Sequence, residues 1–478
     1  MSPRLRITSA TVATVVVGAS LAIVTPPQAL AEPCTGAAAA ARPLPNQAFQ
    51  IPNPSGIAPF NRPIGHKPAG ANESAPAPKL GQLPLMIMKA LIPGPVKQTQ
   101  SGQVQQQAAV VPQPQPTPPV QQQVPAAQPA PAAAAPAPMP VPAGPAATSV
   151  VGMVTGPDSP NKTIEKFAIT GTDLGIMWDN GDSANRQVLM AFGDTNGYCD
   201  VPGKQWRYNA LMRTSDRSLS NTIAVGDGVV GNPYSGSPVW RPGISKQIIN
   251  TINRAPSETG IIPTAGVAIG RSQVINFMSI RNWDSPGSWS TNFSALAVSS
   301  DNGENWGVYP NTVRPVGGGN QNFQMGAFLK PGPGDPYLYS FGTPSGRAGS
   351  AYIARVAPNQ VPDLTKWEYW NGNAWVPSDA AAAVPVIPGP VGEMSAQYNT
   401  YLNQYLALYC NGANDVVMRT SPAPQGPWSP EQVLVRSSEI PGGIYAPYLH
   451  PWSQGKELYY NLSQWSTYNV MLLKTTLP

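Results

Sequence analysis

Three carboxylates stand where short apolar runs begin or end, the place from which a strand presents a polar side chain to a rim. Asp173 stands at the start of one run, Asp194 at the end of the next, and Glu393 at the start of another run far along the chain. Two carboxyl groups suffice for acid–base cleavage of an acetal: one protonates the leaving oxygen, and the other activates water or attacks directly. We therefore expect these three residues to be catalytic, with Glu393 as acid and Asp173 or Asp194 as base or nucleophile.

Each aspartate taken alone has an ordinary alternative, because Asp commonly accepts hydrogen bonds in turns at strand ends. The three carboxylates together favour a functional site. Asp284 follows a second strand run as Asp194 follows the first, so it is a candidate for substrate binding. A solvated turn residue is the alternative for Asp284.

Other chemistries lack the residues that they need. The chain has two histidines and three cysteines, so we expect no metal site built from several His or Cys side chains in the folded part. A Ser-His-Asp triad would have to use His450, and no nucleophile elbow, P-loop or dinucleotide fingerprint accompanies it. We expect no cofactor. Carboxylates, aromatic rings and amides remain, and these are groups that bind carbohydrates.

Three further residues could contact a sugar. Trp178 and Trp283 lie near predicted rim loops and could stack on a sugar ring, although core packing is the commoner role of a Trp. His450 lies on a predicted rim, where it could hydrogen-bond to a substrate or tune the pKa of a carboxylate.

The elements that must position these residues recur five times, in repeats of roughly 60 residues. Each repeat has an inner strand rich in small residues, a middle strand and a third strand. The inner strands are predicted at 172–177, 264–270, 323–329, 392–398 and 443–449, the middle strands at 187–194, 273–281, 336–343, 404–410 and 457–465, and the third strands at 209–214, 294–299, 350–355, 415–420 and 468–473. Small residues suit the crowded strands around a propeller axis. The pattern predicts an all-β fold, a five-bladed β-propeller whose last blade takes its outer strand from around residues 166–170.

One turn motif of the second repeat is expected to be structural. The sequence Ser299-x-Asp301-x-Gly303-x-x-Trp306 matches the Asp-box turn of several propellers. In that turn the aspartate caps the backbone, the glycine takes a positive φ, and the Trp packs between strands. Asp301 is therefore not expected to be a catalytic acid.

The chain before the propeller has a different composition. All 12 Trp and 17 Tyr residues lie from Trp178 onward, so we expect the packed domain at 149–478. Residues 1–31 carry two arginines, a Val/Ala-rich apolar run and the sequence Ala29-Leu30-Ala31, which predicts a cleaved signal peptide. An uncleaved anchor is the alternative, although the apolar run is short for a membrane span. Residues 32–148 are rich in Pro, Gln and Ala, which predicts a disordered linker.

The composition also bears on location and partners. We expect a protein that is secreted or held in the cell envelope, with no membrane span after signal cleavage, and a monomer. The net charge is +5 with 11% charged residues and no basic cluster interleaved with aromatic residues, so nucleic acid is not an expected partner. Cys199 and Cys410 both lie in the predicted domain and could pair, but two buried thiols are an equal alternative. Cys34 lies in the linker.

Six short sequence motifs of the chain resemble those of a known family. They are Thr-Asp-Leu-Gly-Ile-x-Trp-Asp-Asn-Gly from Thr172, Ala-Phe-Gly-Asp-Thr from Ala191, Ser-Asp-Asn-Gly-x-Asn-Trp from Ser300, Asn-Phe-Gln-Met-Gly-Ala-Phe from Asn322, Gly-Thr-Pro-Ser-Gly-Arg-x-Gly-Ser-Ala-Tyr from Gly342 and His-Pro-Trp-Ser from His450. Together, from about residue 160 to the end, the chain resembles the exported actinobacterial family of domain of unknown function 4185. The matching motifs imply Asp173 and Asp194 as catalytic residues and Arg347 as a substrate-binding residue. The assignment of Glu393 as a catalytic residue depends mainly on its position in a predicted inner strand. Asn196 stands where an aromatic residue is expected.

The resemblance also implies an activity. Members of the family are identified as endo-D-arabinanases, five-bladed propellers that cut arabinan in the mycobacterial envelope. It implies a glycoside hydrolase whose partner is a cell-wall polysaccharide, the D-arabinan of arabinogalactan or lipoarabinomannan. A non-catalytic carbohydrate-binding propeller of the cell wall is the alternative. A sialidase-like enzyme is suggested by the Asp box alone and has weak support, because that turn is structural.

Overall fold

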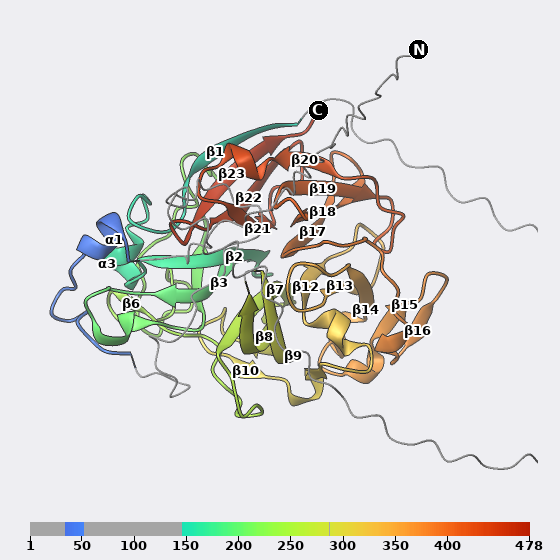
Figure 1. The fold of residues 1–478 in the computed structure, drawn as a ribbon, viewed down its shortest axis with the longest axis horizontal. Helices are drawn as coiled ribbons and strands as arrows, with labels where there is room; N and C mark the ends of the chain where they lie inside the picture. The colour runs from blue at the N-terminus through green and yellow to red at the C-terminus, as the bar shows by residue number, and fades with distance from the viewer. Residues whose placement is uncertain (1–33, 52–145, 286) are drawn as a thin grey trace, which may run out of the picture.

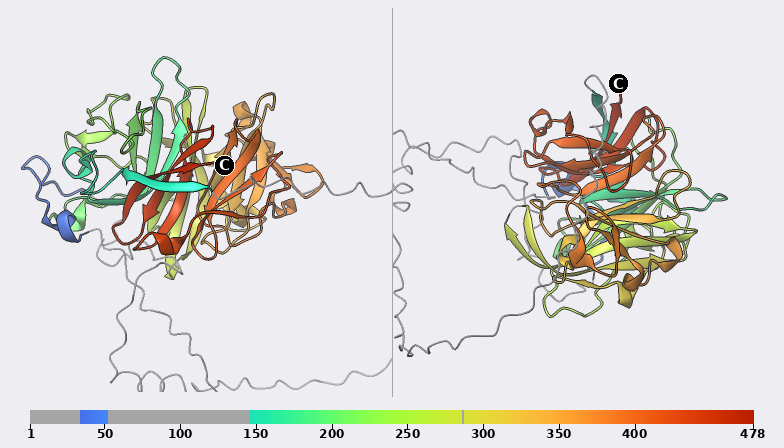
Figure 2. Two further views of the ribbon diagram at one scale, coloured as in Figure 1. Left: turned by 90° about the horizontal axis from the view of Figure 1, so that it is seen from above. Right: turned by 90° about the vertical axis from the view of Figure 1, so that its right-hand side faces the viewer.

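The chain folds into a ring of five β-sheets around a central axis, seen end-on in Figure 1 and from two sides in Figure 2. The computed structural model describes residues 34–51, 146–285 and 287–478. The predicted five-bladed propeller is confirmed, and every predicted inner, middle and third strand overlaps a strand of the structure. The predicted signal peptide and most of the predicted linker lie outside the described residues.

The blades follow one another along the chain, each an antiparallel sheet that runs outward from the axis. Blade one has β2 (Gly171–Asp179), β3 (Val188–Asn196) and β4 (Ala210–Thr214), and blade two has β7 (Gly260–Ile269), β8 (Ser272–Ser285), β9 (Ser288–Ser299), β10 (Gly307–Val308) and β11 (Arg314–Pro315). Blade three has β12 (Met325–Leu329), β13 (Leu338–Thr343), β14 (Tyr352–Val356), β15 (Glu368–Trp370) and β16 (Trp375–Pro377), and blade four has β17 (Met394–Asn399), β18 (Gln404–Cys410), β19 (Val416–Ser421) and β20 (Gln432–Val435). Blade five has β21 (Ile444–Leu449), β22 (Glu457–Gln464), β23 (Asn469–Thr476) and β1 (Ala147–Met153). A hairpin of β5 (Val239–Arg241) and β6 (Ile244–Ser245) and the helices α1 (Gly36–Ala40) and α3 (Thr163–Phe167) lie outside the blades.

Blade five is closed by a strand from the start of the folded chain, as expected, but the strand is a different one. β1 pairs antiparallel with β23, and the Thr148 and Thr475 hydroxyls hydrogen-bond at 2.7 Å. The prediction of an outer strand around 166–170 was wrong, because α3 occupies residues 163–167. The buried guanidinium of Arg207 donates to the Phe167 and Ala168 carbonyls at 3.2 and 2.6 Å and stabilises the end of that helix.

Part of the predicted linker packs against blade one. Cys34 forms a disulfide with Cys199, while Cys410 is a buried free thiol, so the suggested pairing of Cys199 with Cys410 was wrong. Gln47 is 2% exposed, and its Oε1 accepts a hydrogen bond of 2.9 Å from the Tyr198 hydroxyl. Residues 34–51 are therefore fastened to the propeller both covalently and by buried hydrogen bonds.

The Asp-box turn has the structural role expected of it. Asp301 accepts hydrogen bonds from the Ser299 hydroxyl at 2.7 Å and from the Asn305 backbone at 2.9 Å, and Gly303 has a φ of 82°. Trp306 packs against the core between blades one and two. Within the ranges that the structure describes, no helix is long and apolar enough to cross a membrane.

Candidate active site

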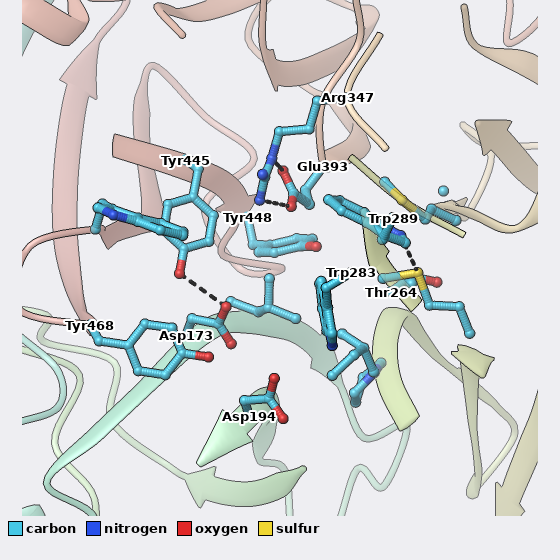
Figure 3. Close-up of a pocket in the computed structure, with 17 residues that line it drawn as sticks. Asp173, Asp194, Thr264, Trp283, Trp289, Arg347, Glu393, Tyr445, Tyr448 and Tyr468 are labelled. Carbon is cyan, nitrogen blue, oxygen red and sulfur yellow. Dashed lines mark hydrogen bonds and ion pairs between the residues drawn. The ribbon is translucent and has the colours of Figure 1, made fainter. Parts of the chain in front are cut away.

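The three predicted carboxylates meet in one small cavity of about 40 Å³ at the end of the channel where the inner strands begin (Figure 3). Asp173 comes from β2 and Asp194 from the end of β3, both in blade one. Glu393 directly precedes β17, so blade four delivers it from elsewhere in the ring. The sequence-based expectation that these residues share a site agrees with their placement, since all three line this cavity.

Asp173 is positioned by a bulged segment of its strand. The register of β2 against β3 shifts on both sides of Leu174, where Leu174 and Gly175 have φ values of 72° and 70°. Blade five holds this bulge: the Ser463 hydroxyl accepts from the Leu174 backbone at 2.8 Å, and Asn461 donates to the Gly175 carbonyl at 2.8 Å. Bulges commonly re-aim a side chain next to a site. The glycine of the Thr-Asp-Leu-Gly motif is thus required by its positive φ and by Asn461, whose Nδ2 would lie 2.7 Å from an added Cβ.

The second motif glycine makes room for the same carboxyl group. A Cβ added to Gly193 would lie 2.4 Å from Oδ1 of Asp173, closer than any side chain could approach. The motif Phe-Gly-Asp therefore serves both aspartates: Gly193 accommodates Asp173, and the next residue is Asp194.

The surroundings of the Asp173 carboxyl group favour its protonated form. Tyr445 donates a hydrogen bond of 2.9 Å to Oδ2, while Oδ1 is buried and has no hydrogen-bond partner among the described residues. Burial raises the pKa of Asp173 from the ordinary value of 3.8 to about 8, and the negative charges of Asp194 and Glu393 contribute to the rise. The hydrogen bond from Tyr445 and the charge of Arg347 oppose it. Asp173 is thus a carboxylic acid that can keep its proton at neutral pH.

Asp194 has a different environment. It is 3% exposed, and its Oδ1 accepts a hydrogen bond of 3.1 Å from the Trp206 indole. The two aspartates therefore lie in one cavity with different hydrogen-bond partners, which is the arrangement that separates an acid from a base.

Glu393 is paired with a cation. Arg347 donates two hydrogen bonds to it, from Nε to Oε2 at 2.9 Å and from Nη2 to Oε1 at 2.6 Å. Burial acts to lower the pKa of Arg347, but the charge and hydrogen bonds of Glu393, with smaller contributions from Tyr445 and Cys410, together raise it above its ordinary value. The guanidinium also lies 5.1 Å from the ring centroids of Trp289 and Tyr445. This bidentate pair engages both oxygens of Glu393.

Aromatic rings form the rest of the wall. Trp283 and Trp289, from the long hairpin of β8 and β9, lie with ring centroids 5.8 Å apart, and Tyr448 and Tyr468 also line the cavity. Arg347 and Trp283, which were expected to bind substrate, are therefore placed beside the carboxylates. Tyr445 was missed. A signal existed, because Tyr445 stands near the start of the fifth inner strand, as Asp173 does in the first.

The other predicted substrate-binding residues lie away from this cavity. Trp178 is 4% exposed in the core between blades and donates to Gln273 at 2.9 Å. Asp284 is exposed and accepts a hydrogen bond from Asn282 at 2.6 Å, so the solvated-turn alternative describes it better. His450 is 1% exposed, packs on Trp452, and has its pKa lowered to about 4 by burial. Asn196 is also buried and does not line the cavity.

The groups at this site can perform acid–base chemistry. In the part of the chain that the structure describes, no group of three or more His, Cys, Asp or Glu side chains is placed to hold a metal ion. The cavity combines a carboxyl group of raised pKa, a second carboxyl group, an Arg-paired carboxylate and aromatic walls. These groups can donate a proton, accept one and stabilise positive charge.

Comparison with solved structures and curated proteins gives several distant similarities. The catalytic domain of Coprinopsis cinerea GH62 alpha-L-arabinofuranosidase is 12% identical, with a TM-score of 0.36 over 69% of this chain and 96% of that one. The GH43_1 enzyme from Xanthomonas citri is 13% identical, with a TM-score of 0.37 over 69% and 89%. Among curated proteins, Notoamide biosynthesis cluster protein J of Aspergillus sp. (strain MF297-2) is 26% identical over 63% of this chain and 81% of its own length.

The strongest assignment comes from a family model. The model described as Domain of unknown function (DUF4185) matches residues 158–474, which include all three carboxylates and the inner strand of every blade, whereas β1 lies before the matched range. The chain therefore belongs to the DUF4185 family.

Proposed function

We propose that this propeller is an endo-acting glycoside hydrolase that cleaves the D-arabinan of mycobacterial-type arabinogalactan or lipoarabinomannan. One observation carries the proposal: Asp173 and Asp194 line the same cavity, and burial and neighbouring charge raise the pKa of Asp173 to about 8. Acid–base cleavage of a glycosidic bond needs two carboxyl groups in different protonation states. The choice of D-arabinan rests on the family resemblance of the motifs that contain these residues.

The two aspartates have distinct roles in the proposed reaction. The protonated carboxyl of Asp173 donates its proton to the glycosidic oxygen while the bond from that oxygen to the anomeric carbon breaks. The Asp194 carboxylate takes a proton from the attacking water, or bonds to the anomeric carbon itself before water replaces it. Both routes leave the leaving sugar with a hydroxyl. In the covalent route the Asp173 carboxylate takes a proton from the incoming water, so both carboxyl groups return to their starting states. In the direct route the proton from water ends on Asp194, and proton exchange with solvent then restores protonated Asp173 and ionised Asp194.

Glu393 has an electrostatic role in this scheme, in place of the acid role expected from the sequence. Both of its oxygens accept hydrogen bonds from Arg347, so neither is placed to donate a proton to a leaving oxygen. After burial and Asp194, its charge is a further cause of the raised pKa of Asp173. The Glu393 charge thus helps to keep the proton on the acid, while the charge of Arg347 opposes it, and Glu393 is the group of the pair that can stabilise the positive charge that develops on the sugar.

The direct test is incubation of the full mature chain with arabinogalactan, followed by analysis of released oligosaccharides. Wild type should release a ladder of fragments, and Asp173→Asn and Asp194→Asn should each lower the rate by about 10² or more. Asp158→Asn is the matched control, because that carboxyl is exposed and lies outside the cavity. Absence of fragments from a wild-type protein that still binds the polysaccharide would establish the non-catalytic binding propeller instead.

We also propose that the protein acts outside the cytoplasm. The disulfide between Cys34 and Cys199 supports this, because such bonds persist mainly in oxidising compartments. The predicted cleavage after Ala31 is tested by N-terminal sequencing of protein from the culture medium and cell envelope. A chain that begins at Met1 and stays in the cytoplasm would contradict export.

A further inference from the structure

The central channel holds a second, larger cavity at its opposite end. Its volume is about 510 Å³, within the usual range of small-molecule sites, whereas the cavity of Asp173 has about 40 Å³. Both cavities are lined from the same five inner strands, the first near the start of each strand and the second further along it. Thr264 and Tyr448 line both cavities and mark the boundary between them.

The charged groups of this second cavity leave one cation uncompensated. Asp179 accepts hydrogen bonds from Arg186 at 2.8 Å, from the Trp452 indole, and from the Gly181 backbone at 2.8 Å, so both of its oxygens have partners. Lys330, just after β12, lines the same cavity. Among the described residues, no ion pair or hydrogen bond of the Lys330 ammonium group occurs. The charge of Asp179 acts on Lys330 through space, but one carboxylate faces two cations, Arg186 and Lys330, so the cavity offers a net positive charge to an anion.

A buried side-chain amide oxygen in the wall of this cavity lacks a hydrogen-bond donor. Gln397 is 7% exposed and lines the cavity, and its Nε2 donates to the Ser453 carbonyl at 2.8 Å. Its Oε1 is buried without a hydrogen-bond partner in the described chain. A buried acceptor without a partner is costly, so a hydroxyl donor reaching this wall would be stabilising.

Part of the remaining wall consists of small apolar side chains, beside larger aliphatic and aromatic ones. Val267, Ala327 and Ala396 from three different blades line it, and the Trp452 ring lies at the rim beneath the Arg186 guanidinium, 4.8 Å from it. Carbon–hydrogen faces of a sugar ring suit such a surface, whereas a long acyl chain would leave the amide and the ammonium group unused.

We propose that this second cavity binds a hydroxylated organic anion of monosaccharide size, a sugar that carries a carboxylate or a phosphate group. The anionic group pairs with Lys330, a ring hydroxyl donates to Gln397, and the ring lies on the small apolar side chains. This binding is independent of the proposed hydrolysis, since the catalytic carboxyl groups line the other cavity.

Isothermal titration calorimetry with the full mature chain tests the proposal, using glucuronate, glucose 6-phosphate and uncharged glucose as probes. At least one anionic probe should bind about tenfold or more tightly than glucose, and the better of the two identifies the anionic group. Lys330→Gln should remove this preference and Lys330→Arg should keep it. Lys366→Gln, at an exposed lysine remote from the cavity lining, is the matched control.

Two further variants separate this site from the first. Asp173→Asn should bind the anion like wild type, and Ala396→Phe, which fills the cavity, should lose binding by a steric route. The proposal is overturned if neither anionic probe binds at about 10 mM, a concentration that would saturate a millimolar site. Unchanged binding by a folded Lys330→Gln, or loss of binding in Asp173→Asn, would also overturn it.

Discussion

Gly193 and Asp173 are in direct contact across two strands, so that a Cβ on Gly193 would stand 2.4 Å from the carboxyl oxygen Oδ1. Gly193→Ala is therefore expected to displace Asp173 and to lower kcat on arabinogalactan by about 10² or more. Gly307→Ala is the control, because no atom lies within 4 Å of its added Cβ. Equal activity of the two variants would show that the position of Asp173 does not matter.

Tyr445 tunes the acid through its hydrogen bond to Oδ2 of Asp173. Activity that needs protonated Asp173 should fall as the pH rises through about 8. The hydrogen bond from Tyr445 lowers this pKa, so Tyr445→Phe should move the alkaline limb of kcat/KM to higher pH. A limb that stays in place or moves to lower pH would contradict the assignment, whatever the change in kcat. Tyr459→Phe, outside the cavity lining, provides the comparison profile.

Asp173 should also make stability depend on pH. Its pKa is 3.8 in its ordinary state and about 8 in the folded protein, so between these values the folded chain holds a proton that the unfolded chain releases. The contribution of this group to the free energy of unfolding is present in full below about pH 4 and is lost as the pH rises toward 8. The Asp173→Asn variant has no carboxyl group to titrate here, so it does not lose this stability as the pH rises.

Urea unfolding at several pH values measures this effect. Relative to wild type, Asp173→Asn should gain stability between pH 4 and 8, by up to a few kcal/mol at the upper end. Asp158→Asn should show no such trend. A difference between Asp173→Asn and wild type that is the same at every pH would rule out a raised pKa.

The disulfide between Cys34 and Cys199 should stabilise the propeller through residues 34–51. It closes a chain segment with a sequence separation of 165, and loss of such a bond typically costs about 2–4 kcal/mol. Cys34→Ser should lower the free energy of unfolding by that amount. Dithiothreitol should destabilise wild type to the same level and leave Cys34→Ser unchanged. A reductant effect of similar size in the variant would point to Cys410 or to non-specific action.

Much of the fold could be predicted because each strand is a local pattern. The middle strand at 404–410 was predicted with the bounds that the structure has, since its short apolar run of Tyr, Leu and Ala residues lies between turns. The strand that closes blade five could not be placed in the same way. β1 and the segment around 166–170 both precede blade one. The second segment is held elsewhere by tertiary contacts, among them the hydrogen bonds from the buried Arg207 to the end of α3.

The carboxylates of the candidate site could be predicted from the sequence, but their surroundings could not. The sequence by itself determined which carboxyl groups could do chemistry, because so few histidines and cysteines remain and because Asp173, Asp194 and Glu393 stand at strand ends. Only the tertiary structure decided their surroundings: Tyr445 beside Asp173, Arg347 paired with Glu393, and Asp284 in solvent. The physical reason is that burial, charge pairing and close contact depend on which blades meet around the axis. Those contacts join residues as far apart as Asp173 and Tyr445, and no local pattern encodes them.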